Sequence, residues 1–233
     1  MKCGVLIFPG TWSHQDFAHV LADVLRCDWG YLWHKETSVV GYDCLILPGG
    51  FAHGDYLRCG AIARFSPIME AVVRFARNGG PVIGSCNGFQ ILCEAGLLPG
   101  ALLRNMSLQY RCRWVRIKTE SVATPFTRGL RLGQVLKLPI SHGEGRYFAA
   151  PETLARLTAN GQIVFRYATP DGRITAEANP NGSLENIAGI CNEGRNVVGL
   201  MPHPERAAEA LLGSEDGLHL FTSALGSVGL VSR

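Results

Sequence analysis

The strongest constraint on the fold is a repeated order of short apolar runs and helical stretches in the first part of the chain. Residues 5–8, Cys44–Leu47 and residues 82–84 are apolar runs that end at or just before a glycine or proline. Runs of this kind predict strands that are buried on both faces, as in parallel sheets. Helical spacing follows each run, at residues 17–25, 69–76 and 87–95. This alternation predicts an α/β fold, with an open, mostly parallel sheet and helices on both faces.

The second half of the chain is richer in strand patterns. Apolar and β-branched residues predict strands at residues 114–118, 135–140, 163–167, 187–191 and 197–200. A turn is expected at the Asn-Pro-Asn-Gly sequence of residues 179–182, and two helices are expected to close the chain. Because no repeat, low-complexity stretch or linker divides the sequence, we expect one domain that spans residues 1–233.

Composition excludes several classes of function. A chain of 233 residues can bury a core without disulfides or a metal, and its net charge of +3 is too small to indicate a nucleic-acid-binding protein. Eight cysteines are scattered without metal-ligand spacing, so we expect no metal site and mostly buried thiols in a reducing compartment. The sequence shows no signal peptide and no long apolar segment. We therefore expect a cytoplasmic protein that makes no contact with a membrane.

Cys86 is the first candidate for chemistry. It lies in the sequence Gly-Ser-Cys-Asn-Gly of residues 84–88, between a predicted buried strand and a predicted helix. This is the context of a nucleophile elbow, a sharp turn that raises a reactive side chain out of the sheet. The start of a helix favours a negatively charged thiolate, and the backbone N–H of Asn87 would donate to an oxyanion. The motif alone is equally compatible with a buried cysteine in a tight turn.

Gln90 follows Cys86 by about one helical turn, so its side chain could overhang the elbow. A polar amide at the start of an apolar helix suits contact with an amino-acid substrate. Taken alone, Gln90 could equally be a helix residue that faces solvent.

His203 and Glu205 are the second half of the candidate site. They lie in the sequence Met-Pro-His-Pro-Glu after the predicted strand at residues 197–200, at the end of the sheet where α/β proteins bind ligands. The two prolines favour an extended segment, in which residues two apart can point the same way. Glu205 would then orient His203, and His203 would take the proton from Cys86. The alternative is an ordinary surface turn.

Two further loops follow predicted strands at the same edge. Glycines in the loop around Gly50 and Phe51 would let a backbone N–H point inward as a second oxyanion donor. His142 and Gly143 would line the pocket through backbone groups. His142 is also a rival catalytic histidine, with Glu144 as its nearest carboxylate.

At these residues the sequence resembles the class I, triad-type glutamine amidotransferases. Within that family it is similar to the glutaminase subunits of phosphoribosylformylglycinamidine synthases, over nearly the whole chain. Five stretches carry the resemblance: LPGGFAHGDYLR at residues 47–58, GSCNGFQIL at 84–92, SHGEGRY at 141–147, NPNGS at 179–183 and GLMPHPER at 199–206. The elbow and the His-x-Glu are general to the class, whereas the first and third stretches indicate the subfamily.

The resemblance implies a flavodoxin-like fold and a Cys86–His203–Glu205 triad that hydrolyses L-glutamine through a glutamyl thioester. Ammonia would pass to a synthetase subunit, which makes formylglycinamidine ribonucleotide from formylglycinamide ribonucleotide in purine synthesis. ATP and Mg²⁺ are expected in that partner, no cofactor is expected in this chain, and a small third subunit is expected in the complex.

The sequence also departs from the family pattern. Residues 11–15, the Ala-His pair at 52–53 and Cys59 differ from the usual residues, which leaves the partner-facing surface and the roles of His14 and His53 open. Three rivals remain: a DJ-1/PfpI-like protein, a γ-glutamyl hydrolase that acts alone, and a non-enzymatic subunit that docks on a synthetase. DJ-1/PfpI-like proteins usually carry histidine directly after the nucleophile, where this chain has Asn87, and the subfamily stretches argue against the γ-glutamyl hydrolase.

Overall fold

The structure is a computed structural model that describes residues 1–226. Half of its main sheet is parallel. The parallel strands are, in spatial order, β2 (Asp28–Trp33), β1 (Lys2–Ile7), β3 (Cys44–Leu47), β4 (Val82–Ser85) and β11 (Val197–Leu200). Each is paired in parallel with its neighbour. Four of these five strands were predicted from the apolar runs, and β2 was not.

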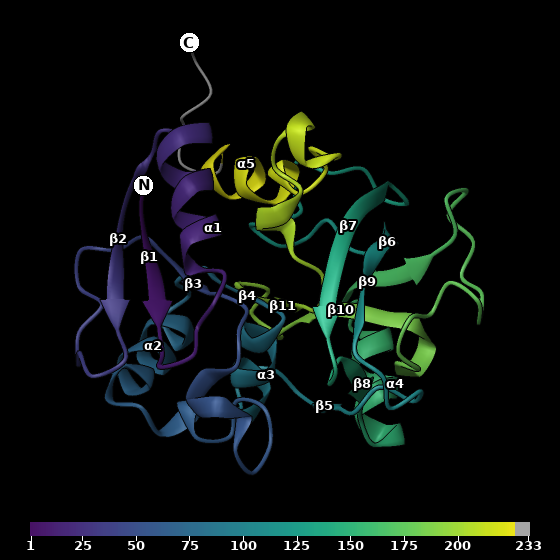
Figure 1. The fold of residues 1–233 in the computed structure, drawn as a ribbon, viewed down its shortest axis with the longest axis horizontal. Coiled ribbons are helices and arrows are strands. Elements are labelled where there is room, and N and C mark those ends of the chain that lie inside the picture. The colour runs from purple at the N-terminus through teal and green to yellow at the C-terminus, as the bar shows by residue number, and fades with distance from the viewer. Residues whose placement is uncertain (227–233) are drawn as a thin grey trace.

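Beyond β11 the same sheet continues with antiparallel strands. These are β10 (Ile187–Cys191), β9 (Ile163–Ala168), β6 (Arg111–Thr119) and β7 (Val135–His142). Every pairing from β11 to β7 is antiparallel. The α/β fold class is confirmed, and the β-rich second half of the sequence extends the parallel sheet into a mixed sheet of nine strands. Figure 1 shows this extension on the side opposite β1 and β2.

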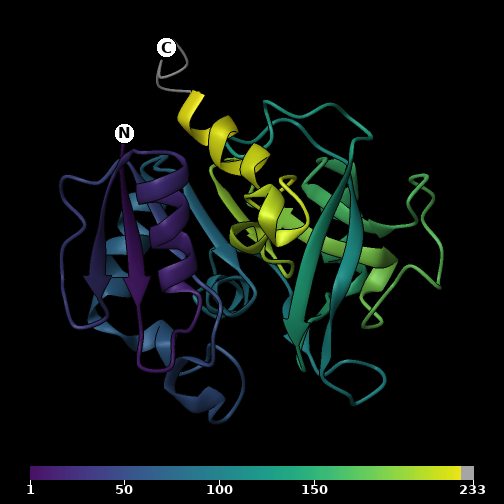
Figure 2. The same cartoon turned by 45° about the horizontal axis from the view of Figure 1, so that its top comes forward.

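Helices cover both faces of the sheet (Figures 1 and 2). On one face, α1 (His14–His19) continues into a π-helical turn at Val20–Val24 and packs together with α5 (Leu218–Gly226) over one buried cluster. The opposite face is covered by α2 (Pro67–Arg77), α3 (Asn87–Glu94) and α4 (Pro151–Ala159). A two-stranded ribbon of β5 (Ala101–Leu103) and β8 (Arg146–Phe148) adjoins this layer. After β11 the described chain ends with short 3₁₀ helices and one α-helix, α5, where two closing helices were expected.

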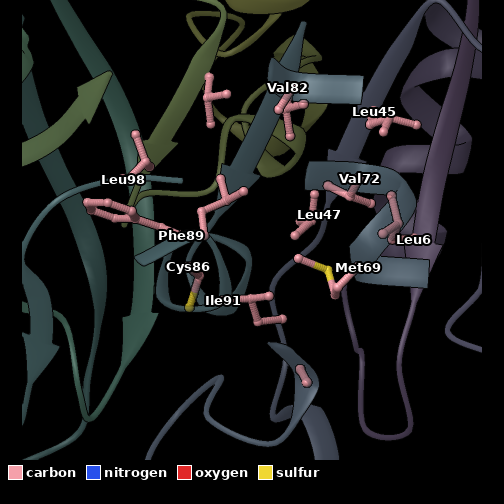
Figure 3. Close-up of a cluster of buried hydrophobic side chains, with 14 of the residues drawn as sticks. Leu6, Leu45, Leu47, Met69, Val72, Val82, Cys86, Phe89, Ile91 and Leu98 are labelled. Atoms are coloured by element: carbon pink, nitrogen blue, oxygen red, sulfur yellow. The ribbon is translucent and has the colours of Figure 1, made fainter. Parts of the chain in front are cut away.

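The cluster beneath α2 and α3 fixes the position of the elbow. Leu47 of β3 and Met69 and Val72 of α2 are almost fully buried in it, together with Phe89 of α3. Figure 3 shows Cys86 at the edge of this cluster, next to Phe89. Burial of these side chains supplies most of the stabilisation of this layer, at about 25 cal/mol per Å² of apolar surface removed from water. Within residues 1–226, no helix is long and apolar enough to cross a membrane.

Candidate active site

The strands that precede the predicted site residues all direct their carboxyl ends toward one edge of the sheet. The parallel strands β3, β4 and β11 end there, and β7, the fourth strand beyond β11 in an antiparallel series, runs in the same direction. A cavity of about 260 Å³ opens at this edge. Its lining residues are Trp12, Gly49, Gly50, Phe51, Cys86, Tyr110, Ser141, His203 and Arg206. The Cys86 elbow, the loop after β3 and the His203 segment therefore converge as their strand positions predicted.

The elbow at Cys86 is a strained turn that only small neighbours allow. Cys86 has φ 50° and ψ −109°, a backbone conformation that residues other than glycine rarely adopt. A Cβ atom on Gly88 would lie 1.9 Å from the carbonyl oxygen of Leu47, and one on Gly84 would lie 2.6 Å from the backbone of Gly88. The two glycines thus let α3 pack directly on β3 and β4. Cys86 itself is 5% exposed, with Sγ 3.7 Å from the carbonyl oxygen of Ser141.

His203 is held from both sides beside the elbow. Its backbone N–H donates to the Pro139 carbonyl of β7 (2.9 Å), and its Nδ1 lies 2.6 Å from Oε1 of the buried Glu205. Its Nε2 has no hydrogen-bond partner among residues 1–226. A Cβ atom on Gly49 would lie 2.6 Å from Cε1 of His203 and 3.2 Å from Cβ of Cys86. Only glycine at this position lets the imidazole and the thiol lie side by side.

The charge state of His203 follows from these neighbours. Burial lowers the pKa of the imidazole, but the negative charge of Glu205 and the nearby Cys86 raise it by more, to about 10. His203 is therefore favoured as an imidazolium at neutral pH, between the carboxylate and the sulfur. This is the arrangement that stabilises a cysteine thiolate as a nucleophile.

The loop after β3 offers one free backbone donor. The Gly49 N–H donates to the Ser13 hydroxyl (2.9 Å), and the Phe51 N–H donates to the Gly10 carbonyl (2.8 Å). The Gly50 N–H has no partner among residues 1–226, and neither does the Asn87 N–H at the start of α3. The structure thus leaves Gly50 and Asn87 as the two available oxyanion donors. Phe51 lines the cavity with its side chain, while its amide is already occupied.

Comparisons with known proteins show the family of the chain. Residues 1–217 match the family model of the CobB/CobQ-like glutamine amidotransferase domain. A phosphoribosylformylglycinamidine synthase subunit PurQ from Moorella thermoacetica is 61% identical over 223 residues, which cover 96% of this chain and 94% of the relative. The PurQ of Koribacter versatilis is 59% identical over 228 residues, which cover 98% and 99%. The chain belongs to the PurQ family.

Solved structures place the PurQ fold among its relatives. A chain in the structure of PurLQS from Thermotoga maritima has a TM-score of 0.86 and 39% identity, with 97% of this chain and 98% of that chain covered. The glutaminase domain of a Trypanosoma brucei CTPS has a TM-score of 0.59 at 13% identity, over 97% and 94% of the two chains. The second likeness shows a shared fold only.

Four of the residues predicted to bind the oxyanion or the substrate, namely Asn87, Gln90, His142 and Gly143, lie outside the cavity lining of this PurQ-family chain. Nε2 of Gln90 donates to the Glu144 carbonyl (2.6 Å), and its Oε1 accepts from Nδ2 of Asn87 (2.9 Å), so this side chain joins α3 to the loop after β7. The Gly143 carbonyl accepts from the N–H of Asn105. Contact between these groups and substrate therefore stays a prediction, and it would require them to exchange partners.

His142 is not positioned as a rival base. Successive residues of a strand point to opposite faces, so Ser141 faces the cavity while His142 is buried on the other side of β7. Neither ring nitrogen has a partner among residues 1–226. Burial, with a smaller contribution from His203, lowers the pKa of His142 to about 3, which keeps the ring neutral.

Sequence reasoning missed four lining residues, namely Trp12, Tyr110, Ser141 and Arg206. The sequence could have indicated two of them. Ser141 precedes His142 in a strand, so the two side chains face opposite sides of the sheet, and Arg206 directly follows Glu205. The other two lie in loops after β1 and before β6, where no pattern in the sequence indicates which side chain faces the edge of the sheet. Within residues 1–226, no group of three or more His, Cys, Asp or Glu side chains is arranged to hold a metal ion.

Proposed function

We propose that this chain is the glutaminase subunit of a phosphoribosylformylglycinamidine synthase and that Cys86, His203 and Glu205 are its catalytic residues. The observation that carries the proposal is the open cavity at the elbow, where Cys86 meets the His203–Glu205 pair in a chain that matches PurQ proteins over nearly its full length. Nucleophile, base and orienting carboxylate are then present at one site, in the order that acyl transfer requires.

The first half of the reaction forms a thioester. The Cys86 sulfur, whose proton has moved to Nε2 of His203, attacks the side-chain amide carbon of L-glutamine. The oxygen of the tetrahedral intermediate accepts hydrogen bonds from the N–H groups of Gly50 and Asn87. When the carbon–nitrogen bond breaks, His203 returns its proton to the leaving nitrogen, so that ammonia departs and a glutamyl thioester remains on Cys86.

The second half releases glutamate. Water attacks the thioester carbon and gives a proton to His203, and the carbon–sulfur bond then breaks. The proton returns to the sulfur and restores the starting state. Glu205 keeps its hydrogen bond to Nδ1 of His203 throughout, which fixes the ring orientation and stabilises the imidazolium.

Ammonia then reaches a synthetase partner. The similar chain was solved as part of PurLQS from Thermotoga maritima. This likeness supports a PurL-type synthetase and a small PurS-type subunit as partners of this chain. The synthetase would consume ATP with Mg²⁺ to convert formylglycinamide ribonucleotide to formylglycinamidine ribonucleotide in purine synthesis. This chain would carry no cofactor of its own.

We also propose that residues 1–233 form one domain that works in the cytoplasm. A single nine-stranded sheet joins the two halves of the described chain, which supports the first point. All eight cysteines are free, and all but Cys112 are buried or partly buried, which suits a reducing compartment.

Replacing the nucleophile tests the proposed function. In the assembled synthase, Cys86→Ser is expected to abolish synthesis from glutamine and to leave synthesis from added ammonium salt close to the wild-type rate, because the synthetase site needs only ammonia. Product formation is measured with each nitrogen source in turn. Glutamine-dependent turnover within about tenfold of wild type would contradict the assignment of Cys86, since loss of a nucleophile costs far more.

A further inference from the structure

Among residues 1–226, Arg206 is the only residue of the cavity lining with a permanent charge. Trp12, Tyr110, Ser141 and the loop residues Gly49, Gly50 and Phe51 contribute neutral groups. The charges of Cys86 and His203 belong to the chemistry and lie at the floor, where both residues are at most 5% exposed. The Arg206 side chain is 33% exposed, far more than either of these two residues. The cavity thus has a reactive floor and one fixed positive charge nearer its mouth.

The fold positions the guanidinium of Arg206 but leaves some of its N–H donors without a hydrogen-bond partner among residues 1–226. Arg206 ends the 3₁₀ turn of Pro204–Arg206 that also carries Glu205, so its backbone is fixed by the same segment as the triad. Its Nε donates to Oδ2 of Asp16 in α1 (2.9 Å). The two terminal nitrogens have no hydrogen-bond partner among residues 1–226. One edge of the guanidinium therefore anchors the side chain, and its terminal N–H groups remain available to a ligand.

We propose that Arg206 binds the α-carboxylate of L-glutamine and so positions the amide carbon over Cys86. The inference rests on the proposed glutaminase function. Glutamine has its reactive amide at one end and its carboxylate at the other, which matches a sulfur at the floor and a cation nearer the mouth. Arginine is suited to this role, because its planar donors pair with both oxygens of a carboxylate. Arg206 would then make the site selective for side-chain amides that carry a free α-carboxylate.

Two other roles of Arg206 give different kinetic signatures. If Arg206 only tied α1 to the His203 segment through Asp16, its loss would act on every substrate alike. If it mainly stabilised the Cys86 thiolate, its loss would lower kcat for every amide by the same factor. Only contact with the α-carboxylate makes the loss depend on whether the substrate has that group.

The test compares L-glutamine with 4-aminobutanamide, the same molecule without the carboxylate. Hydrolysis of each is measured in the complex with the synthetase, for wild type, Arg206→Gln and Arg206→Lys. Arg206→Gln is expected to raise KM for glutamine roughly 10- to 100-fold, because the charge-assisted hydrogen bonds between the guanidinium and the α-carboxylate are lost. It is expected to change kcat by less than about threefold. The preference for glutamine over 4-aminobutanamide, as the ratio of kcat/KM values, should fall by the same factor as the rise in KM. Arg206→Lys, which keeps the charge but not the planar donors, should be intermediate.

Asp16→Asn is the matched control, because it breaks the same ion pair and leaves the guanidinium in place. It is expected to keep most of the preference for glutamine. If 4-aminobutanamide reacts too slowly, its competitive inhibition constant supplies the same ratio. A wild-type preference in Arg206→Gln, whatever its absolute activity, would overturn the inference while the proposed function stands. A wild-type complex that does not hydrolyse glutamine would overturn the proposed function, and the inference with it.

Discussion

At the scale of single residues, the site depends on the charge of His203. Glu205 and Cys86 overcome the effect of burial and raise the pKa of the imidazole to about 10. A group whose pKa is raised on folding stabilises the folded state in full below its unfolded pKa, here 6.5, and loses that contribution as the pH rises through about 10. In the proposed mechanism the imidazolium is also the acid that protonates the departing nitrogen. Activity should therefore persist into mildly alkaline solution and fall as the pH approaches 10.

Glu205→Gln tests this dependence. The substitution removes the carboxylate that raises the pKa of His203 but leaves the burial that lowers it. The alkaline limb of the kcat profile should therefore move to lower pH, with a lower maximum rate because the ring also loses its strongest partner. The profile is measured for glutamine hydrolysis between about pH 6 and 10 in the complex, with ammonium-dependent synthesis as the control for the partner. An alkaline limb at the wild-type position in Glu205→Gln would contradict the role assigned to the carboxylate.

The sequence predicted that Cys86, His203 and Glu205 come together because they follow the buried strands β4 and β11, and strand ends of a parallel sheet meet at one edge. It did not predict Arg206, since the side chain that an arginine after Glu205 would meet depends on where α1 packs. It left His142 open as a rival base, and the structure disfavours that role because β7 extends to His142 and strand alternation turns the ring away from the cavity. The choice among the amides of the loop after β3 also needed the structure, because hydrogen bonds to Ser13 and Gly10 decide it.

At the scale of elements, the contact between α3 and β3 holds the elbow together. Gly88 faces the Leu47 carbonyl so closely that Gly88→Ala would place a Cβ atom 1.9 Å from it. Because the obstacle is backbone, α3 must move away from the sheet and disturb the packing of Phe89. We expect a loss of about 3 kcal/mol or more in the free energy of unfolding, measured by urea denaturation, and a large fall in kcat as Cys86 moves from His203.

Gly226→Ala at the end of α5 is the matched control, because a Cβ atom there meets nothing within 4 Å. It should change the free energy of unfolding by about 0.5 kcal/mol or less. Stability of Gly88→Ala within that margin would show that α3 can shift without cost, and would remove the reason given for glycine at the elbow.

The sequence predicted the strands that are buried on both faces, and it did not predict the strands and helices that are largely exposed. The four apolar runs became β1, β3, β4 and β11, since only a central parallel strand needs such a run. The edge strand β2 and the helix α4 are largely exposed, so their sequences carry a weak apolar pattern. Ser13 takes the N-cap position of α1, but its hydroxyl accepts from the Gly49 N–H instead of capping the helix.

At the scale of the whole molecule, the mouth of the cavity is shaped for a cover. Trp12 is 68% exposed and meets the half-exposed Phe51 edge-on, with ring centroids 6.2 Å apart. Tyr110, in the loop just before β6, is 52% exposed. Large apolar side chains gathered at the rim of a pocket mark a site where another surface docks. Phe51 also directly follows Gly50, whose N–H is the proposed oxyanion donor. A partner that packs on this rim would therefore act on the loop that carries the donor.

We accordingly expect the isolated chain to be a slow glutaminase that becomes fast only in the complex. Correct placement of one oxyanion donor is worth about 10² to 10³ in kcat, so a partner that binds only the loop state with Gly50 directed at the substrate would restore that factor. By linkage, formation of the thioester should tighten partner binding by the same factor. The measurement is kcat for glutamine hydrolysis, first for the isolated chain and then with saturating synthetase, nucleotide and acceptor. Equal values in both states would show that the loop is already set in the free chain, and would favour a hydrolase that acts alone.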